Sequence, residues 1–459
     1  MARRSTLCLL ALWVAASAAG ARELSREAEW LAGYLRIDTT NPPGREAEAA
    51  AYLAEILNRA GVATERYATP NGRTSLVARL PATVPGAPWL VLVHHLDVVP
   101  AGSEGWQRPP FAGELDQGEL VGRGAVDCKS LGIAHLAAIL DAARLPARRR
   151  GVLLLAVADE ENGGAEGMGW LIERHPELLE GVEAALGEGG LNRTILGRTY
   201  FWGIETAEKR AYWLELVASG RAGHGSSLNP ESAAHQLVRA LGRVIDRPPR
   251  WQLQAPVRAF LAELERIDPQ MRGRAGPVDE AIGPDGPAPW LPPGLWGLTL
   301  DTVQVTALEA GDRPNVVAGE ARARLDVRLL PETDAEAYLA ELAQLLGSGI
   351  EMRVELATPA VPASSVESPV WRELAAALAD EAPAVPAMIP GITDARFLRA
   401  RGIPAYGFSP FELEPEYLRR VHAPDERIPL ASFDDGVERM VRVVRALVAP
   451  VETDSSARR

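Results

Sequence analysis

The feature that most constrains this chain is an apolar run that ends abruptly in acids. Residues 151–157 read GVLLLAV, and one residue later come Asp159, Glu160 and Glu161. An unbroken apolar run of this length predicts a strand that is buried on both faces of a sheet. Three acids at the end of such a strand are costly to bury unless a cation or another partner offsets their charge. The segment therefore predicts a layered fold with a charged site at the edge of its sheet.

Strand and helix patterns alternate near both ends of the chain. We expect helices within 23–61 (broken by a loop at 39–44) and at 130–143, 370–380 and 433–447, and strands at 75–80, 89–93, 151–157, 184–186 and 405–408. This alternation predicts an α/β fold with a mixed central sheet flanked by helices. The pattern changes between 210 and 358, where strands at 211–219, 299–308, 321–330 and 350–357 accompany helices at 230–244 and 331–346. We therefore predict one domain from 22–209 and 359–459, interrupted by an inserted α+β domain at 210–358, with an irregular Pro- and Gly-rich stretch at 275–297.

Composition describes an ordinary, acidic globular protein. The chain has 459 residues, of which 47% are hydrophobic and 24% charged, and its formal net charge is −13. An acidic balance argues against nucleic acid and anionic membrane surfaces as partners, and it is compatible with a small-molecule substrate.

The N-terminus has the pattern of a secretory signal peptide. Arg3 and Arg4 precede an apolar run at 7–16, and small residues follow it. The run is too short to span a bilayer, so we predict cleavage near residue 21 and a secreted or periplasmic protein with no stable membrane span. An uncleaved anchor and twin-arginine export remain alternatives. Cleavage removes Cys8 and leaves Cys128 alone, so no internal disulfide can form.

Five short segments each supply a residue of a type that binds metals. In chain order they are HHLDVVP, GRGAVDCKS, ADEENGG, ALGEGG and VHAPDERI, which contain His95, Asp127, Glu161, Glu188 and His422. Each one alone has an ordinary alternative, such as a helix N-cap, a turn acid or a solvated histidine. Together, two imidazoles and three carboxylates, one of them shared, form two sets of three ligands. Such sets suit zinc, with cobalt or manganese as substitutes, and we predict two ions per chain.

Two neighbouring acids have predicted supporting roles. Side chains two apart on a strand face the same way, so we expect Asp97 to hydrogen-bond the far ring nitrogen of His95 and orient that ring. Glu160 would act as the general base toward water. We also expect Glu426 to support the site from behind the ligands.

These segments resemble the zinc aminoacylase and carboxypeptidase family of co-catalytic metallopeptidases. The resemblance runs from about residue 30 to about 447, and the motifs TTNPPG, HxDVVP, W-x-x-x-P-F, AEK and HxxxERI are most similar to the carboxypeptidase S and secreted N-acyl-amino-acid hydrolase branch. It implies that one zinc is held by His95, Asp127 and Glu188, and the other by Asp127, Glu161 and His422. It also implies a cis peptide bond between Asp127 and Cys128.

The resemblance makes the inserted domain a lid that can also mediate dimerisation. His224 in GRAGHGS would polarise the scissile carbonyl, often from the second subunit of a dimer; a plain strand-end histidine is the alternative. Asn315 would meet the substrate, supported by Arg328 unless that arginine pairs with a lid acid. In PGITDARF, three residues would frame the substrate carboxylate: Gly391, Thr393 and Arg396. Ile392 departs from the family's second glycine in this loop and can reshape that pocket.

The sequence therefore predicts a di-zinc hydrolase that cleaves an amide bond next to a free carboxylate. N-acyl amino acids are favoured, because apolar residues of the excursion offer contact area: Trp290, Leu291, Leu295 and Trp296. A carboxypeptidase or dipeptidase acting on short peptides is the alternative. Two remote alternatives are a non-catalytic binding homologue and a hydrolase that uses Cys128 as its nucleophile.

Overall fold

A computed structural model describes residues 24–450, except 269–270, 272 and 274–275. The predicted leader at 1–21, and Cys8 within it, lies outside the described residues. Over the described part of the chain, none of the helices is both long and apolar enough to span a bilayer.

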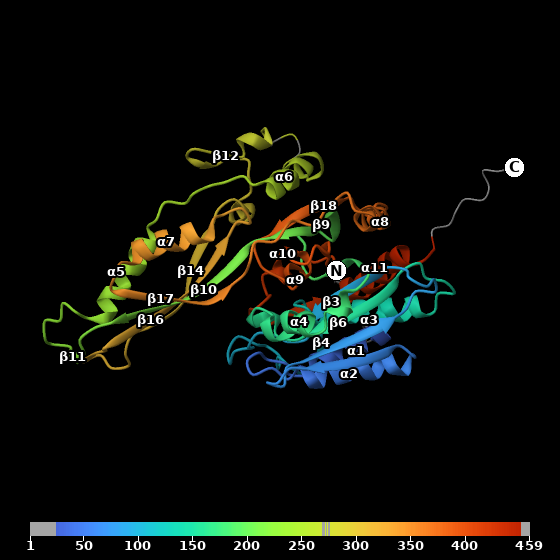
Figure 1. Ribbon diagram of the computed structural model, residues 1–459, viewed down its shortest axis with the longest axis horizontal. Coiled ribbons are helices and arrows are strands. Elements are labelled where there is room, and N and C mark those ends of the chain that lie inside the picture. Colours follow the sequence, from blue (N-terminus) through green and yellow to red (C-terminus); the bar gives the residue numbers. More distant parts are fainter. Residues whose placement is uncertain (1–23, 269–270, 272, 274–275, 451–459) are drawn as a thin grey trace, which may run out of the picture.

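A nine-stranded mixed sheet forms the centre of the larger body (Figure 1). Its strands are β1 (Ala63–Ala68), β2 (Thr74–Leu80), β3 (Trp89–His95), β6 (Gly151–Val157), β7 (Val182–Gly187), β8 (Arg193–Ile195), β9 (Arg198–Glu208), β18 (Ala384–Ile389) and β19 (Ala405–Gly407). Their order is β1-β2-β6-β3-β7-β19-β9-β18, and β8 pairs with β9. The four strands β6, β3, β7 and β19 run parallel to one another. The predicted mixed α/β fold is confirmed.

Helices cover both faces of this sheet, because successive side chains of a strand point to opposite faces. Leu90 and Leu92 of β3 join one core, which contains α1 (Arg26–Leu35), α2 (Glu46–Arg59), α3 (Lys129–Ala143), α8 (Pro369–Leu378) and α11 (Leu430–Val448). Val91 and Val93 join a second core with α4 (Trp170–Arg174) and α9 (Ala395–Arg399). The central strands are buried on both sides, as the unbroken apolar run of β6 predicts.

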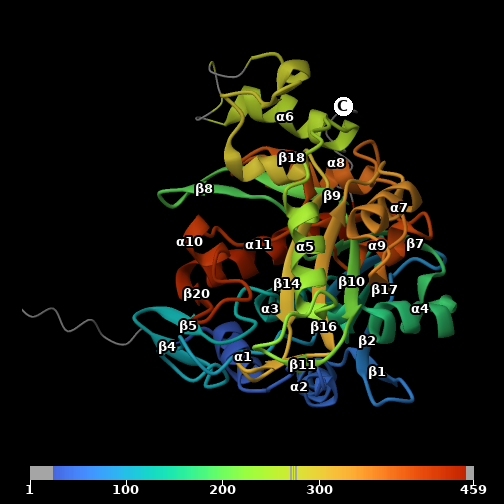
Figure 2. The same cartoon turned by 90° about the vertical axis from the view of Figure 1, so that its left-hand side faces the viewer.

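The sheet and helices of the segment 210–358, for which we keep the name lid, project from the larger body as a second layer structure (Figure 1) and face the viewer in Figure 2. The antiparallel sheet of the lid has the order β14 (Thr302–Glu309), β16 (Glu320–Leu329), β10 (Arg210–Ser219) and β17 (Ile350–Ala357). Helices α5 (Ala233–Ile245) and α7 (Ala335–Leu346) pack on one face of it around their own core. The chain passes from β9 into β10 at Lys209, whose ammonium donates to the carbonyls of Gly297 (3.1 Å) and Leu300 (2.9 Å).

The segment between the lid helices packs against the large sheet instead of the lid sheet. Helix α6 (Ala255–Ile267), which the sequence patterns did not predict, joins a core with β9 and β18. The predicted excursion is irregular, with a short hairpin of β12 (Ile282–Gly283) and β13 (Gly286–Pro287) between single 3-10 turns. Leu291 is buried in this core, and Trp290 and Leu295 pack against it. Three of the four apolar residues expected to contact substrate therefore pack on the protein itself, whereas Trp296 is exposed.

Smaller elements complete the fold around one end of the large sheet. Strand β20 (Arg427–Pro429) pairs with β5 (Glu119–Val121), which pairs with β4 (Glu114–Asp116). Helix α10 (Pro415–Leu418) precedes the His422 loop. At the tip of the lid, β11 (Gly223–His224) pairs with β15 (Val316–Val317).

Two histidines are buried without hydrogen-bond partners between the large sheet and α3. His94 and His135 have ring centroids 5.7 Å apart, and none of their four ring nitrogens has a partner among the described residues. Burial lowers the pKa of His135 to about 3, whereas an imidazole in the unfolded chain titrates near pH 6.5. Between these two pH values the unfolded chain binds more protons than the folded chain, so the stability is lost as the pH falls below about 6.5.

We therefore expect His135→Leu to stabilise the protein more at low pH than at high pH. The gain in unfolding free energy over wild type should grow by about 2 kcal/mol between pH 8 and pH 5, because each pH unit is worth about 1.4 kcal/mol. Denaturant melts at the two pH values measure it. His235→Leu, at an exposed position of the lid helix, is the matched control for the replacement of a histidine by leucine. A difference in unfolding free energy between His135→Leu and wild type that does not depend on pH would contradict the lowered pKa of His135.

Candidate active site

The predicted ligands gather at one edge of the sheet because three parallel strands end there. His95 is the last residue of β3 and is in register with Val157, the last residue of β6. Strand β7 ends at Gly187, directly before Glu188. The carboxyl ends of parallel strands meet at the same edge, which is where ligands bind in open α/β sheets. The side chains that follow β3, β6 and β7 are thus brought together without any long excursion of the chain.

The first donor set consists of His95, Asp127 and Glu188. His95 Nε2 lies 3.0 Å from Asp127 Oδ1 and 3.2 Å from Glu188 Oε2. The other ring nitrogen, Nδ1, lies 2.8 Å from the main-chain carbonyl oxygen of Asp97, while the Asp97 carboxylate is 3.7 Å away. The ring is therefore oriented through the carbonyl group of Asp97, and a hydrogen bond from the ring to the Asp97 carboxylate stays a prediction.

The second donor set consists of Asp127, Glu161 and His422. His422 Nε2 lies 3.2 Å from Asp127 Oδ2 and 3.2 Å from Glu161 Oε2. Asp127 thus turns one carboxylate oxygen toward each histidine, the arrangement expected of a carboxylate that bridges two ions. The pairing of β20 with β5 brings the loop of His422 beside Asp127, almost 300 residues apart in sequence. The peptide bond between Asp127 and Cys128 is cis, as the resemblance implies.

The electrostatics of the two sets favour a cation. Burial raises the pKa of Glu161 to about 7, and the nearby Asp127 carboxylate adds to the effect. Hydrogen bonds with Asp127 and Glu161 raise the pKa of His422 to about 10. Oxygen Oε1 of Glu161 is buried without a hydrogen-bond partner among the described residues. Carboxylates and imidazoles so close together, with a buried oxygen unpaired, fit divalent ions with mixed nitrogen and oxygen ligands.

Glu160 lies beside both sets and belongs to neither. Its main-chain N–H donates to Asp97 Oδ1 over 3.2 Å. This bond fixes the turn and does not involve the Glu160 side chain. Burial raises the pKa of Glu160 well above its ordinary value, and the charge of Glu188 raises it further. A carboxyl group with a raised pKa next to a metal site is suited to accept and return a proton near neutral pH.

A buried polar network lies beneath the turn that carries Glu160 and Glu161. Asp97 Oδ2 accepts from the Glu161 N–H (3.2 Å) and from the Asn41 side-chain amide (2.7 Å). Arg73 donates to Asp159 Oδ1 over 2.7 Å and pairs with Glu46 on its other side. The sequence patterns missed Arg73 as a functional residue, and Asn41 was seen only as part of TTNPPG. One buried guanidinium thus balances the carboxylates that hold the turn.

Two further arginine networks support the remaining ligands. Glu426 accepts the main-chain N–H groups of Val126 (2.8 Å) and Asp127 (3.0 Å) and pairs with Arg123 at 2.7 Å, in agreement with its expected place behind the ligands. On the other side, Arg399 pairs with Glu205 at 2.7 Å.

The PGITDARF loop lies next to the first donor set, and Thr393 and Arg396 bond within the protein, whereas both carboxylate oxygens of Asp394 are buried without a hydrogen-bond partner among the described residues. Thr393 donates its N–H (3.0 Å) and its hydroxyl (2.9 Å) to Glu208 Oε2. Arg396 is 3% exposed and donates to the carbonyl oxygens of Gly163 (2.8 Å) and Thr393. Gly391 is half-buried at the start of the loop. The structure thus places Arg396 as a clamp between two loops, and its predicted contact with a substrate carboxylate stays a prediction.

The predicted lid residues do not meet the donor sets within this chain. His224 and Asn315 lie together at the tip of the lid, where both are exposed and the Gly225 N–H donates to the Asn315 carbonyl over 2.8 Å. Figure 1 shows β11, which carries His224, at the end of the lid far from β3. Arg328 lies on β16 and pairs with Asp326 (2.6 and 2.9 Å), the alternative raised for it from the sequence.

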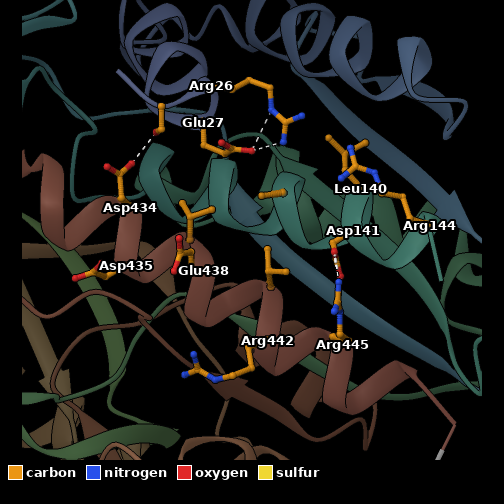
Figure 3. A pocket seen from close by; sticks show the side chains of 14 residues that line it. Arg26, Glu27, Leu140, Asp141, Arg144, Asp434, Asp435, Glu438, Arg442 and Arg445 are labelled. Carbon is orange, nitrogen blue, oxygen red and sulfur yellow. Dashed lines mark hydrogen bonds and ion pairs between the residues drawn. The ribbon is translucent and has the colours of Figure 1, made fainter. Parts of the chain in front are cut away.

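A surface groove between α1, α3 and α11 lies away from both donor sets (Figure 3). Two ion pairs cross its lining, Arg26 with Glu27 and Arg445 with Asp141, and the Ser25 hydroxyl donates to Asp434 over 2.6 Å. We assign no substrate to this groove, because none of the predicted site residues lines it.

Comparison with known proteins identifies the fold and the family. Residues 91–446 match the family model described as Peptidase family M20/M25/M40. Aminoacylase-1B of Rattus norvegicus is 28% identical over 428 residues, which cover 91% of this chain and 94% of that protein. A probable carboxypeptidase S-like 2 of Dictyostelium discoideum is 25% identical over 383 residues, 76% of this chain and 70% of that protein. An M20 family metallo-carboxypeptidase of Sulfolobus solfataricus superposes with a TM-score of 0.71 at 21% identity, covering 92% and 99% of the two chains.

The Arg73 network predicts a large cost for removing that guanidinium. Arg73→Met leaves three buried carboxylates near one another without their counter-charge, so we expect the unfolding free energy to fall by about 3 kcal/mol or more. Denaturant titration measures the change. Arg59→Met removes the exposed pair with Glu55 and is the matched control, because exposed pairs contribute little. Similar effects of the two substitutions would contradict a structural role for the buried network.

Proposed function

Because this chain belongs to peptidase family M20/M25/M40, we propose that it is a di-zinc hydrolase that cleaves an amide bond beside a free carboxylate in N-acyl amino acids or short peptides. Membership of the family makes the chain a metal-dependent enzyme that hydrolyses amide bonds. The observation that carries the proposal is the position of Asp127 between two histidine-containing donor sets, with Glu160 beside them and outside both.

The residues of the chain would divide the chemistry as follows. Two ions bound at the donor sets would supply Lewis-acid chemistry, which polarises a substrate oxygen and lowers the pKa of water. Glu160 takes a proton from the attacking water while the water oxygen forms a bond to the carbonyl carbon. Glu160 then gives this proton to the leaving nitrogen as the C–N bond breaks, so the products are a carboxylic acid and an amine. The Asp97 contacts with the Glu160 and Glu161 amides hold the base and the ligand in one geometry.

Zinc is the metal we propose for both sets. Imidazole and carboxylate ligands with open coordination positions suit zinc, and cobalt or manganese can replace it. The family is metal-dependent, and a structural relative is described as a dinuclear metal-binding peptidase of the M20 family.

N-acyl amino acids are the substrate class we favour. The matches to aminoacylase-1 proteins over 91% of the chain support this choice. The apolar residues of the excursion support it less than their sequence suggests, because Leu291 is buried and Trp290 and Leu295 pack on the core with β9 and β18. Hydrolysis of short peptides by a carboxypeptidase or dipeptidase is the alternative, and the match to a probable carboxypeptidase S-like protein favours it.

Two remote alternatives gain no support. A non-catalytic binding homologue would lack a ligand or the base, whereas His95, Asp127, Glu161, Glu188, His422 and Glu160 are all in place. A Cys128 nucleophile needs an accessible thiolate, but Cys128 is 3% exposed and burial raises the pKa of its thiol.

We also propose a homodimer in which His224 completes the site of the partner subunit. His224 is exposed at the lid tip, its ring hydrogen-bonds Ser226 (2.8 Å), and it lies apart from the donor sets of its own chain. A dimer formed through the lid would give this imidazole a carbonyl group to polarise.

The leader pattern at 1–21 supports the proposal that the protein is exported to the periplasm or the medium.

An activity panel tests the proposed function. The mature chain, loaded with zinc or stripped by a chelator, is incubated with N-acyl amino acids and with dipeptides, and the release of free amino acid is measured. Glu160→Gln should lower kcat by about 10²–10⁴-fold while two metals remain bound, because it removes proton transfer and leaves both donor sets intact.

Glu166→Gln, on the same loop and outside both donor sets, is the control and should keep its activity. Two bound metals with no turnover across the panel would reject the substrate class. A chain that binds no metal would reject the di-metal hydrolase itself.

A mixing experiment tests the role of His224. His224→Ala and Glu160→Gln homodimers should each be nearly inactive. Equimolar exchange of subunits should recover up to about a quarter of the wild-type activity, because each mixed dimer contains one site with both residues intact. Mass spectrometry confirms that mixed dimers have formed. Mixed dimers without recovered activity would contradict action between subunits.

A further inference from the structure

We propose that Cys128 supplies a thiolate ligand to the metal ion at the first donor set, an inference that rests on the proposed di-metal function. The resemblance brings only imidazole and carboxylate ligands to this ion. A sulfur donor would make the two metal positions chemically different, one with a soft ligand and one with hard ligands only.

The geometry places the thiol within the first donor set. One donor atom from each of His95, Asp127, Cys128 and Glu188 lies within 4.8 Å of the other three. Ligands of one tetrahedral zinc ion, with Zn–S near 2.3 Å and Zn–N near 2.0 Å, lie about 3.5 Å apart, so only a small shift of the side chains is needed. Four protein donors give this ion the ligand number of a closed zinc site, so the open position for water and substrate would lie at the second donor set.

The thiol lies beside His95, the histidine of the first donor set, and interacts with its side chain. The thiol sulfur also lies 3.7 Å from the His95 carbonyl oxygen, a long distance even for a weak sulfur donor. Cys128 is 3% exposed, so it is held inside the protein at the floor of the site and does not face solvent. The ordinary alternative is a small apolar filler in the core, a common role for a buried cysteine, because Cys128 also borders the core of α3.

Ligation by sulfur has a definite chemical consequence. When the ion binds, the thiol proton is released to solvent and the sulfur bonds as the thiolate. Thiolate ligands favour zinc over manganese and magnesium, which prefer oxygen. We therefore expect the first donor set to bind zinc more tightly and more selectively than the second, which contains only His422 and two carboxylates.

Cobalt(II) substitution of the full chain tests this inference, because a cobalt–thiolate bond gives an intense near-ultraviolet charge-transfer band that nitrogen and oxygen ligands do not give. With two cobalt ions bound, wild type should show the band and Cys128→Ser should lack it. Cys8→Ser should retain the band and controls for the other thiol. Competition with a zinc chelator should show affinity for one of the two ions reduced by about tenfold or more in Cys128→Ser, with the other unchanged.

The outcomes separate this inference from the proposed function. Two bound cobalt ions and amide hydrolysis without the charge-transfer band would overturn the thiolate ligand and leave the hydrolase standing. Equal zinc affinities in wild type and Cys128→Ser would also overturn it. A chain that binds no metal would contradict the proposed function, and the thiolate ligand that rests on it. Cys128→Ala, with circular dichroism of both variants, shows whether any loss of binding comes from misfolding, and Ala should lose the band as Ser does.

Discussion

The rest of the structure depends on a cluster of carboxylates at the carboxyl edge of the large sheet. Asp127, Glu161 and Glu188 lie within hydrogen-bond reach of two histidines, and Glu160 lies beside them. Buried carboxylates that are not balanced by positive charge are strongly unfavourable, so the fold must supply cations there or leave positions for metal ions. Both are seen here. The donor atoms face one another, as ligands of a metal ion would, and buried arginines pair with the acids behind them.

The arginines form a second layer that fixes the geometry of the first. Arg73 lies under the turn of Glu160, Arg123 under Asp127 through Glu426, and Arg399 near the loop after Glu188 through Glu205. Each arginine pairs with an acid that is itself almost fully buried, so solvent screens these interactions little. This layer keeps the donors in place, while the lid forms a separate body with its own core. Fixed ligands and a separate lid are compatible with substrate binding between them.

Sequence patterns predicted most of the long elements but not what each of them packs against. The run of β6 is identified by its apolar residues alone, and the prediction matches Gly151–Val157. Helix α7 starts after Asp334, whose side chain caps it by accepting the Ala337 N–H over 3.1 Å, so the expected start at 331 was slightly early. Helix α6 was missed although its buried residues Val257, Phe260, Leu261 and Leu264 recur at helical spacing, and only the structure shows that this face packs against β9 and β18.

The sequence by itself determined which residue types stand at the ends of the buried strands, since a strand and the acid or histidine that follows it are covalent neighbours. The tertiary structure decided how those residues are used. It turned the two oxygens of Asp127 toward different histidines, through the pairing of β20 with β5. It gave the Asp97 carboxylate to two main-chain amides, and it buried Arg396 between two loops. The reason is physical: hydrogen bonds are directional and short-ranged, so the partner of a buried polar group depends on segments that only folding brings near.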